Sequence, residues 1–200
     1  MTAGRKRGLI GVATAVMMFG LVGCGSSGSP ASPAPPGPSS EPAHPNLPPR
    51  PVELRLDGVN PCSLLTDAQR AHLGVNRGQA GHSSASSSLS GEDCAWSNLP
   101  ESPDNAWLGR AILDQGADYA WGLEPLRSVD GFAATTTGSI GSDPAYYCLM
   151  LVDVAPGQSL LAQYGNNSHD YPGMNHQLAC DKAQQLASDM LSTLRSIKQR

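Results

Sequence analysis

The stretch YYCLMLVDVAPGQSLLAQY, residues 146–164, decides the fold. Its first half is apolar at most positions on both faces of an extended strand, which is typical of a strand inside a sheet. The tetrapeptide at residues 155–158, Ala-Pro-Gly-Gln, suits a type II turn, which takes proline second and glycine third. A second apolar run follows the turn. The stretch therefore predicts a β-hairpin whose first strand is central.

Shorter segments outside the hairpin have the composition of further secondary structure. Residues 93–96 and 106–113 are strand candidates, and residues 132–140, rich in threonine and alanine, are expected to be extended. Residues 117–123 are expected to form a short helix.

Helices are predicted at both ends of the folded region. A helical segment opens at Pro61, Thr66 and Gln69 have capping-box spacing, and Gly74 is a stop signal. In the last helix, apolar residues recur at three- and four-residue steps: Cys180, Ala183, Ala187, Met190, Leu194 and Ile197. The predicted fold class is α+β, an antiparallel sheet with N- and C-terminal helices packed on it.

The N-terminus has the pattern of an export signal. Arg5-Lys6-Arg7 precede an apolar run of 14 residues, too short for a membrane span, and Leu21-Val22-Gly23-Cys24 matches a bacterial lipobox. We expect residues 1–23 to be a cleaved lipoprotein signal peptide and Cys24 to be the lipid attachment site. The alternative is an ordinary signal peptide that happens to contain a cysteine.

Composition divides the rest of the chain into a tether and a domain. Ten of the 17 prolines lie between Pro30 and Pro51, after a Gly/Ser-rich stretch. Residues 24–51 are therefore expected to be the lipidated cysteine and a disordered, partly polyproline-II tether. Residues 52–200 are expected to form a single globular domain on the extracytoplasmic face of the cell membrane.

The charge of the chain limits the classes of partner that it can bind. The formal net charge is −4, and cleavage before Cys24 leaves 10 Lys/Arg against 17 Asp/Glu, or −7. Nucleic acid is excluded as a partner because no cationic stripe can neutralise phosphates. Attraction to anionic headgroups is excluded too, so the lipid itself is expected to provide the contact with the plasma membrane.

The four remaining cysteines are expected to form two disulfides, as an even number favours in an exported chain. Three connectivities are open. Cys62 and Cys180 lie in predicted helices, and Cys94 and Cys148 lie in predicted strands. We expect the pairs Cys62–Cys180 and Cys94–Cys148, helix to helix and strand to strand.

Together with the lipobox and the Ser/Pro linker, four cysteine-centred motifs resemble a known family: NPCSLLT at 60–66, CAW at 94–96, CLMLVDV at 148–154 and CDKA at 180–183. The chain resembles the actinobacterial lipoproteins grouped as domain of unknown function 3558, over residues 52–200. The resemblance implies an envelope lipoprotein without an established activity, so no catalytic residue is carried over. The plan is also loosely similar to extracellular sensor domains of mycobacterial receptor kinases, which implies ligand binding only at the level of the fold.

No recognised catalytic motif is present. Neither Gly-x-Ser-x-Gly nor Ser-x-x-Lys occurs, and no glycine-rich phosphate loop follows a strand. His169, Asp170 and His176 lie within eight residues, but a zinc site needs three or four ligands, so a polar loop is expected there. His72 is expected to be a surface or packed histidine. We assign no catalytic, cofactor-binding or metal-ligating residue and expect no cofactor.

The aromatic residues leave two interpretations open. Trp96 is expected in the core beside Cys94. Four others lie among polar residues and are expected to close the core, although in a cleft they would stack on glycan or hold an apolar ligand: Trp107, Tyr119, Trp121 and Tyr171.

Two functions follow as expectations. The first is a lipid-anchored envelope protein without enzymatic activity that binds a small ligand, a cell-wall component or another envelope protein. The second is a cell-wall hydrolase or transferase whose site is assembled from residues distant in sequence. A pocket that places Glu or Asp next to His would favour the second function.

Overall fold

A computed structural model describes residues 47–83, 89–98, 105–120, 126–137, 146–166 and 172–199. All of them belong to one compact unit, Glu41–Arg200. The predicted signal peptide, Cys24 and most of the predicted tether lie outside the described residues.

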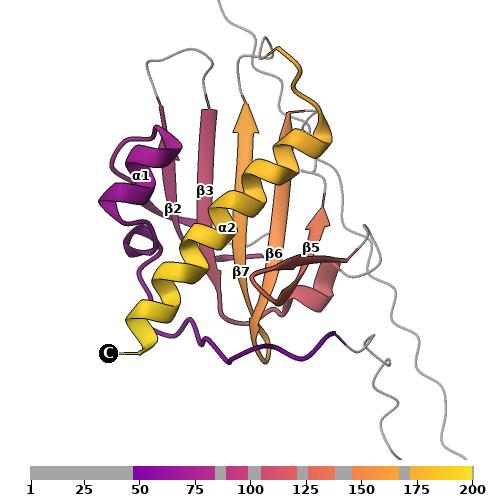
Figure 1. Cartoon of the computed structure of the whole chain (residues 1–200). Coiled ribbons are helices and arrows are strands. Elements are labelled where there is room, and N and C mark those ends of the chain that lie inside the picture. The colour runs from indigo at the N-terminus through magenta and orange to yellow at the C-terminus, as the bar shows by residue number, and fades with distance from the viewer. Residues whose placement is uncertain are drawn as a thin grey trace, which may run out of the picture. The chain divides into compact units, whose positions relative to one another are not determined.

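The architecture is one antiparallel sheet of seven strands, with two α-helices and two 3-10 turns (Figure 1). The order across the sheet is β1-β2-β3-β7-β6-β5-β4. In chain order the elements are η1 (Pro61–Leu64), α1 (Asp67–Leu73), β1 (Gln79–Ser83), β2 (Gly91–Ser97), β3 (Asn105–Ile112), η2 (Ala117–Ala120), β4 (Arg127–Val129), β5 (Phe132–Thr137), β6 (Tyr147–Ala155), β7 (Gln158–Asn166) and α2 (His176–Lys198).

The predicted hairpin is confirmed as β6 and β7, joined at Pro156 and Gly157. Gly157 has φ 67°, the left-handed conformation that a type II turn requires at its third position. Both strands lie inside the sheet, because β7 pairs with β3 and β6 pairs with β5. The apolar residues on both faces of β6 are accordingly buried.

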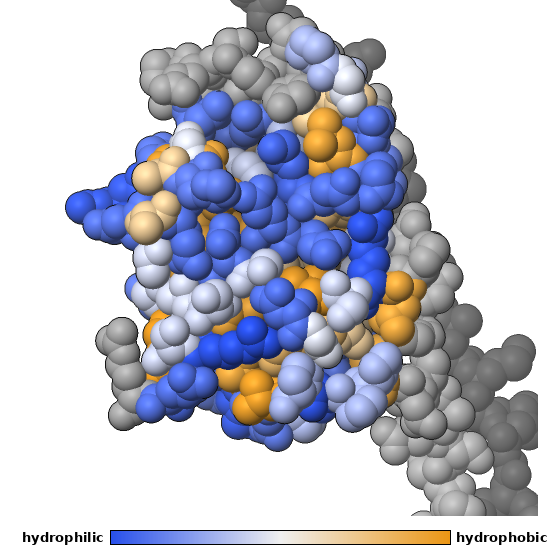
Figure 2. Space-filling view, viewed as in Figure 1, coloured by the Kyte–Doolittle hydropathy of each residue, from blue (hydrophilic) through white to orange (hydrophobic). Residues whose placement is uncertain are grey.

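Helix α2 covers one face of the sheet and crosses it diagonally (Figure 1). Its predicted stripe is buried from Cys180 to Leu194, whereas Ile197 is 37% exposed near the end. A Cβ on Gly109 of β3 would come within 2.8 Å of Met190 Sδ, so the helix approaches the sheet closely at a glycine. The space-filling view of this face shows mainly hydrophilic residues, with smaller hydrophobic areas beside the helix (Figure 2).

The predicted N-terminal helical segment is divided in two. Its second part, α1, has the predicted capping box between Thr66 and Gln69 and ends at left-handed Gly74. No residue of α1 is fully buried, whereas η1 buries Pro61 and Leu64. Leu65 between them is extended and 2% exposed, so the buried side chains of this segment come from η1 and Leu65 rather than from α1.

Other predicted segments agree with the structure where it describes them. Residues 106–113 correspond to β3 and residues 93–96 lie in β2. The predicted helix at 117–123 is a 3-10 turn over Ala117–Ala120, and the predicted extended segment at 132–140 begins with β5; their remaining residues lie outside the described ranges. Strands β1 and β4 were not predicted, because neither GlnAlaGlyHisSer nor ArgSerVal has an apolar alternation.

The predicted disulfide pairing is wrong. The bridges are Cys62–Cys94 and Cys148–Cys180, with Cα atoms 5.0 and 4.9 Å apart. Cys94 and Cys148 cannot pair because β3 and β7 lie between their strands, a separation of about 14 Å at the usual strand spacing.

Cys62 and Cys180 are separated for a second reason. The amide of Gln69 on α1 donates to the carbonyl of Asp189, so the N-terminal segment meets α2 nine residues after Cys180. Nine helical residues span about 14 Å. Each cysteine of η1 and α2 therefore bonds to the strand directly beneath it.

An extended segment, residues 50–57, runs along the lower end of the sheet before η1 (Figure 1). Arg50 forms an ion pair with Asp153 of β6 at 2.7 Å. The Leu54 N–H donates to the Val154 carbonyl at 2.8 Å. This segment brings Leu56 and the following turn to the ends of the strands, where the cleft described below is formed.

Candidate ligand-binding cleft

A cleft lies between the turn at residues 56–61 and strands β1, β2 and β3. It consists of two adjoining hollows of about 350 and 360 Å³ that share Gly58, Val59 and Glu92. The first hollow is lined by Leu56, Gly58, Val59, His82, Ser90, Gly91, Glu92, Ala111, Leu113 and Asp114, and the second by Gly58, Val59, Asn60, Pro61, Ala80, Glu92 and Asp93.

Local sequence explains why the chain arches over the strands. Gly58 has φ 70°, and the Val59 N–H donates to the Leu56 carbonyl at 3.0 Å, which closes a tight turn. The side chain of Asn60 then caps η1 by accepting from the Cys62 N–H at 2.9 Å. The turn is thus held at both ends, and Val59 between them packs partly buried against the core.

Gly91 keeps the floor of the cleft close to the backbone of β3. A Cβ at this position would overlap the carbonyl oxygen of Ala111. Only glycine therefore lets β2 begin at this distance from β3, and the cleft lies directly above this contact.

The lining combines aliphatic side chains with acidic groups. Leu56, Val59, Ala111 and Leu113 are apolar, and Leu113 is 49% exposed. At the rim, the cross-strand pair His82 and Glu92 is joined by a contact of 3.0 Å between Nδ1 and Oε1, with side chains that are 57% and 67% exposed.

Carboxylates outnumber cations around the cleft. Asp57, next to the turn, accepts from Gln158 Nε2 at 3.0 Å and from Arg55 Nε at 2.9 Å. These hydrogen bonds, that of Gln158 first, lower the pKa of Asp57 below its usual value. No lysine or arginine is among the described residues that line the cleft.

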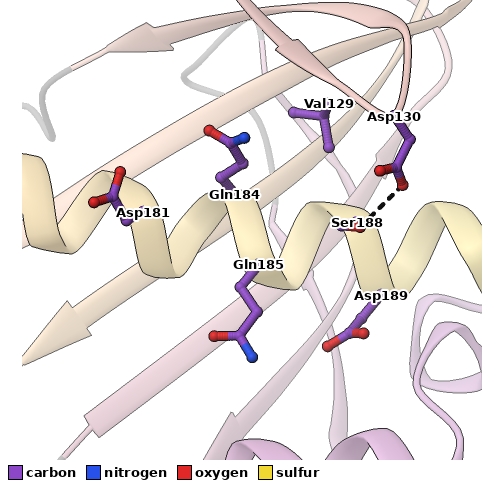
Figure 3. A pocket seen from close by; sticks show the side chains of 7 residues that line it. All are labelled: Val129, Asp130, Asp181, Gln184, Gln185, Ser188 and Asp189. Carbon is purple, nitrogen blue, oxygen red and sulfur yellow. Dashed lines mark hydrogen bonds between the residues drawn. The ribbon is translucent and has the colours of Figure 1, made fainter.

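A separate hollow of about 390 Å³, which is not part of the cleft, lies along α2, with Val129 of β4 and Asp130 of the β4–β5 turn at its wall (Figure 3). Its lining is polar, and Figure 3 shows Gln185 and Asp189 on the opposite side of the helix from Gln184. Asp130 accepts from the Ser188 hydroxyl at 2.9 Å, so this contact fastens the turn to the helix. We regard this hollow as a helix–turn contact rather than as a ligand site.

Burial raises the pKa of Asp189, which borders the hollow along α2, and the nearby His72 opposes the shift. One carboxylate oxygen of Asp189 is buried with no hydrogen-bond partner among the described residues. Within the same residues, no three His, Cys, Asp or Glu side chains form a group that could hold a metal ion.

The comparison with protein families now adds to this geometry. A model described as "Protein of unknown function (DUF3558)" matches residues 19–193, most of the chain. The chain belongs to this family. No curated protein and no solved structure matches the DUF3558 chain. The match spans every residue that lines the cleft.

None of the described residues of the polar loop that the sequence singled out lines the cleft. His169 and Asp170 of this DUF3558 chain lie outside the described residues. His176 opens α2, with Nε2 at 3.6 Å from Sγ of Cys180. His72 is exposed on α1.

Among the described residues, no aromatic side chain lines the cleft. Trp96 and Trp107 are 1% and 4% exposed in the core, and the Trp107 ring meets Tyr164 edge-on at 4.7 Å. Tyr119 is exposed, and Trp121 and Tyr171 lie outside the described residues. The interpretation that Trp96 packs in the core near Cys94 is confirmed.

Sequence reasoning missed the cleft residues for identifiable reasons. His82 and Glu92 meet only because β1 pairs with β2, and β1 has no strand pattern. The dipeptide Asp57-Gly58 was an available signal, since it is typical of a tight turn.

In the described part of the DUF3558 chain, no helix combines the length and apolar character needed to cross a membrane.

Proposed function

We propose that this protein is a lipid-anchored, extracytoplasmic binding module without enzymatic activity, and that its small-molecule ligand occupies the cleft over β1–β3. The cleft itself carries this proposal. Here aliphatic side chains from two parts of the chain, Leu56 and the pair Ala111 and Leu113, line a hollow together with polar groups.

The lipobox supports the anchoring part of the proposal. Its residues 21–24 lie within the range that the family model matches. The first ion pair of the described chain is at Arg50, which leaves about 25 residues between Cys24 and the folded unit. At about 3.1 Å per residue, such a proline-rich spacer reaches on the order of 80 Å.

The anchor is tested by Cys24→Ala. We expect the variant to leave the membrane fraction and to lose labelling by a fatty-acid probe, because one thiol carries the lipid. Anchoring would be refuted if the Cys24→Ala variant stayed in the membrane fraction and the wild type carried no fatty-acid label.

The binding role is tested by closing the cleft. Full-length protein is incubated with a small-molecule extract of the cell envelope and examined by native mass spectrometry. Ala80→Trp fills the second hollow from an exposed strand, and Ala68→Trp on the exposed side of α1 is the matched control. We expect a bound species in wild type and Ala68→Trp that is lost in Ala80→Trp; a species indifferent to Ala80→Trp, or no species at all, contradicts the proposal.

One observation favours the second candidate function, a cell-wall hydrolase. The ring of His82 contacts Glu92 through Nδ1, and Ser90 lines the same hollow two residues before Glu92. A serine, a histidine and a carboxylate are the residue types of an acyl-transfer site. The more-than-half-exposed side chains of His82 and Glu92 are instead typical of a surface pair.

A fluorophosphonate probe separates the two functions. The binding module should show no labelling in wild type. Labelling that disappears in both Ser90→Ala and His82→Ala would establish the hydrolase and refute the proposal.

A further inference from the structure

We propose that the cleft selects a primary-amine amphiphile: an aliphatic body on the apolar floor and an ammonium group that donates to Glu92 and Asp114. This inference rests on the proposed function, in which the cleft binds a small ligand. It concerns the chemical class of that ligand, which the charges around the cleft decide.

The two carboxylates enter the cleft from different parts of the chain. Glu92 lies in β2, and Asp114 follows the end of β3, so the acidic groups belong to adjacent elements of one rigid sheet. Beside them, Leu113 and Val59 offer apolar surface. An ammonium group next to an alkyl chain matches this arrangement, because each end of the ligand meets its own kind of surface.

The two nearby arginines already form ion pairs with carboxylates of this chain. Arg55 contacts Asp57 at 2.9 Å and Glu53 at 3.6 Å. Arg110 bonds to Asp93 at 3.0 Å and to the Leu89 carbonyl at 2.7 Å. Among the described lining residues, His82 is the one group able to carry positive charge, and it contacts Glu92. An anionic ligand would therefore face a described lining that contains Glu92, Asp93 and Asp114 but no lysine or arginine.

The lining also separates primary amines from two other cations. A metal ion is disfavoured because the described residues provide no group of three ligands. A quaternary ammonium ion is usually held by an aromatic cage, and the described lining has no aromatic side chain. A primary ammonium instead has three N–H donors for carboxylate oxygens.

The experiment is a titration of ¹⁵N-labelled full-length protein, followed by amide chemical shifts. The ligands share one alkyl chain and differ in the head group: hexylamine, hexanol, hexyltrimethylammonium and hexanoate. We expect shifts at cleft residues such as Gly58 and Gly91, with hexylamine binding at least about fivefold more tightly than hexanoate. Hexanol and the quaternary ion should fall between them.

Substitutions of the acidic and of the apolar lining residues test which groups bind the ligand. Glu92→Gln and Asp114→Asn should each weaken hexylamine binding by about two- to fivefold and leave hexanol unchanged. Asp181→Asn on α2 removes the same charge outside the cleft and is the matched control. Leu113→Ser, at a half-exposed position, should weaken all four ligands.

The outcomes distinguish the two proposals. If no ligand shifts cleft residues, the proposed binding site fails. If all four ligands bind there with equal affinity, or if hexanoate binds most tightly, the cleft is a binding site but its selectivity for amines is refuted. Equal losses in Asp181→Asn and Glu92→Gln would also refute it, because the effect would then come from overall charge.

Discussion

The two halves of the sheet are built alike and used differently. Each half is a three-stranded meander, β1-β2-β3 or β5-β6-β7, whose middle strand is bonded by a disulfide to a helical segment. Both disulfides span 32 residues. In the β5–β7 half, the bridge is fully buried under α2, whereas in the β1–β3 half Cys62 is only partly buried.

This difference in coverage explains why the cleft lies in the β1–β3 half of the sheet. The β5–β7 half is covered by a 23-residue helix, and its strands are buried along nearly their whole length. The β1–β3 half is covered by the four-residue turn η1 and, at Gly109 of β3, by α2, and β1 is largely exposed. The cleft lies in the half that the short element covers incompletely.

The largest expected effect comes from removing each disulfide in turn. Because both loops have the same length, the chain-entropy model gives the same loss of about 3.7 kcal/mol in the free energy of unfolding. We expect Cys148→Ala/Cys180→Ala to lose about 1 kcal/mol more than Cys62→Ala/Cys94→Ala, since both of its sulfurs are fully buried. Urea unfolding without reductant measures both; equal losses would show that the native environment adds nothing.

The next effect compares one buried arginine from each half. Arg110 bonds to Asp93, Ser83 and the Leu89 carbonyl, and its side chain is 12% exposed, against 28% for Arg50 beside Asp153. Arg110→Ala should cost about 3 kcal/mol because it leaves Asp93 buried and unpaired. Arg50→Ala should cost a similar amount, because it leaves the carboxylate of Asp153, 2% exposed against 11% for Asp93, without its counter-charge. Urea unfolding in which either variant loses less than about 1 kcal/mol would contradict this account.

A smaller effect compares one glycine from each half. A Cβ on Gly78 would overlap Cys94 Sγ and Trp96 Nε1, which the bridge and the core hold in place. A Cβ on Gly165 would overlap the ring of Tyr147, which is partly exposed and able to turn away. We expect Gly78→Ala to cost about 2 kcal/mol and Gly165→Ala clearly less. Thermal unfolding of the two variants measures the difference, and a larger loss for Gly165→Ala would refute it.

The smallest effect concerns the contact between α1 and α2. Burial raises the pKa of Asp189, so the ionised carboxylate is disfavoured in the folded state at neutral pH. This cost is absent below the ordinary value of 3.8, grows as the pH rises above it and is constant above the raised pKa. Asp189→Asn should therefore stabilise the protein by less than about 1 kcal/mol at pH 7 and leave stability at pH 3 unchanged. Unfolding at both pH values tests this; a stabilisation that persists at pH 3 would point to another cause.

The sequence by itself determined the elements that local chemistry specifies. The turn at Pro156 and Gly157, the capping box of Thr66 and Gln69, and the buried stripe of α2 all rest on residues a few positions apart. Periodicity and capping act at this range, so the hairpin, the C-terminal helix and the antiparallel sheet could be predicted.

Only the tertiary structure decided which segments meet. The insertion of β3 and β7 between β2 and β6 separates Cys94 from Cys148 and so sets both disulfides. Strand β1 depends on β2 for its pairing, and the contact of His82 with Glu92 and the cleft below it follow from that pairing. These features depend on the order of strands across the sheet, which is fixed by the packing of the whole core and not by the residues nearest to each site.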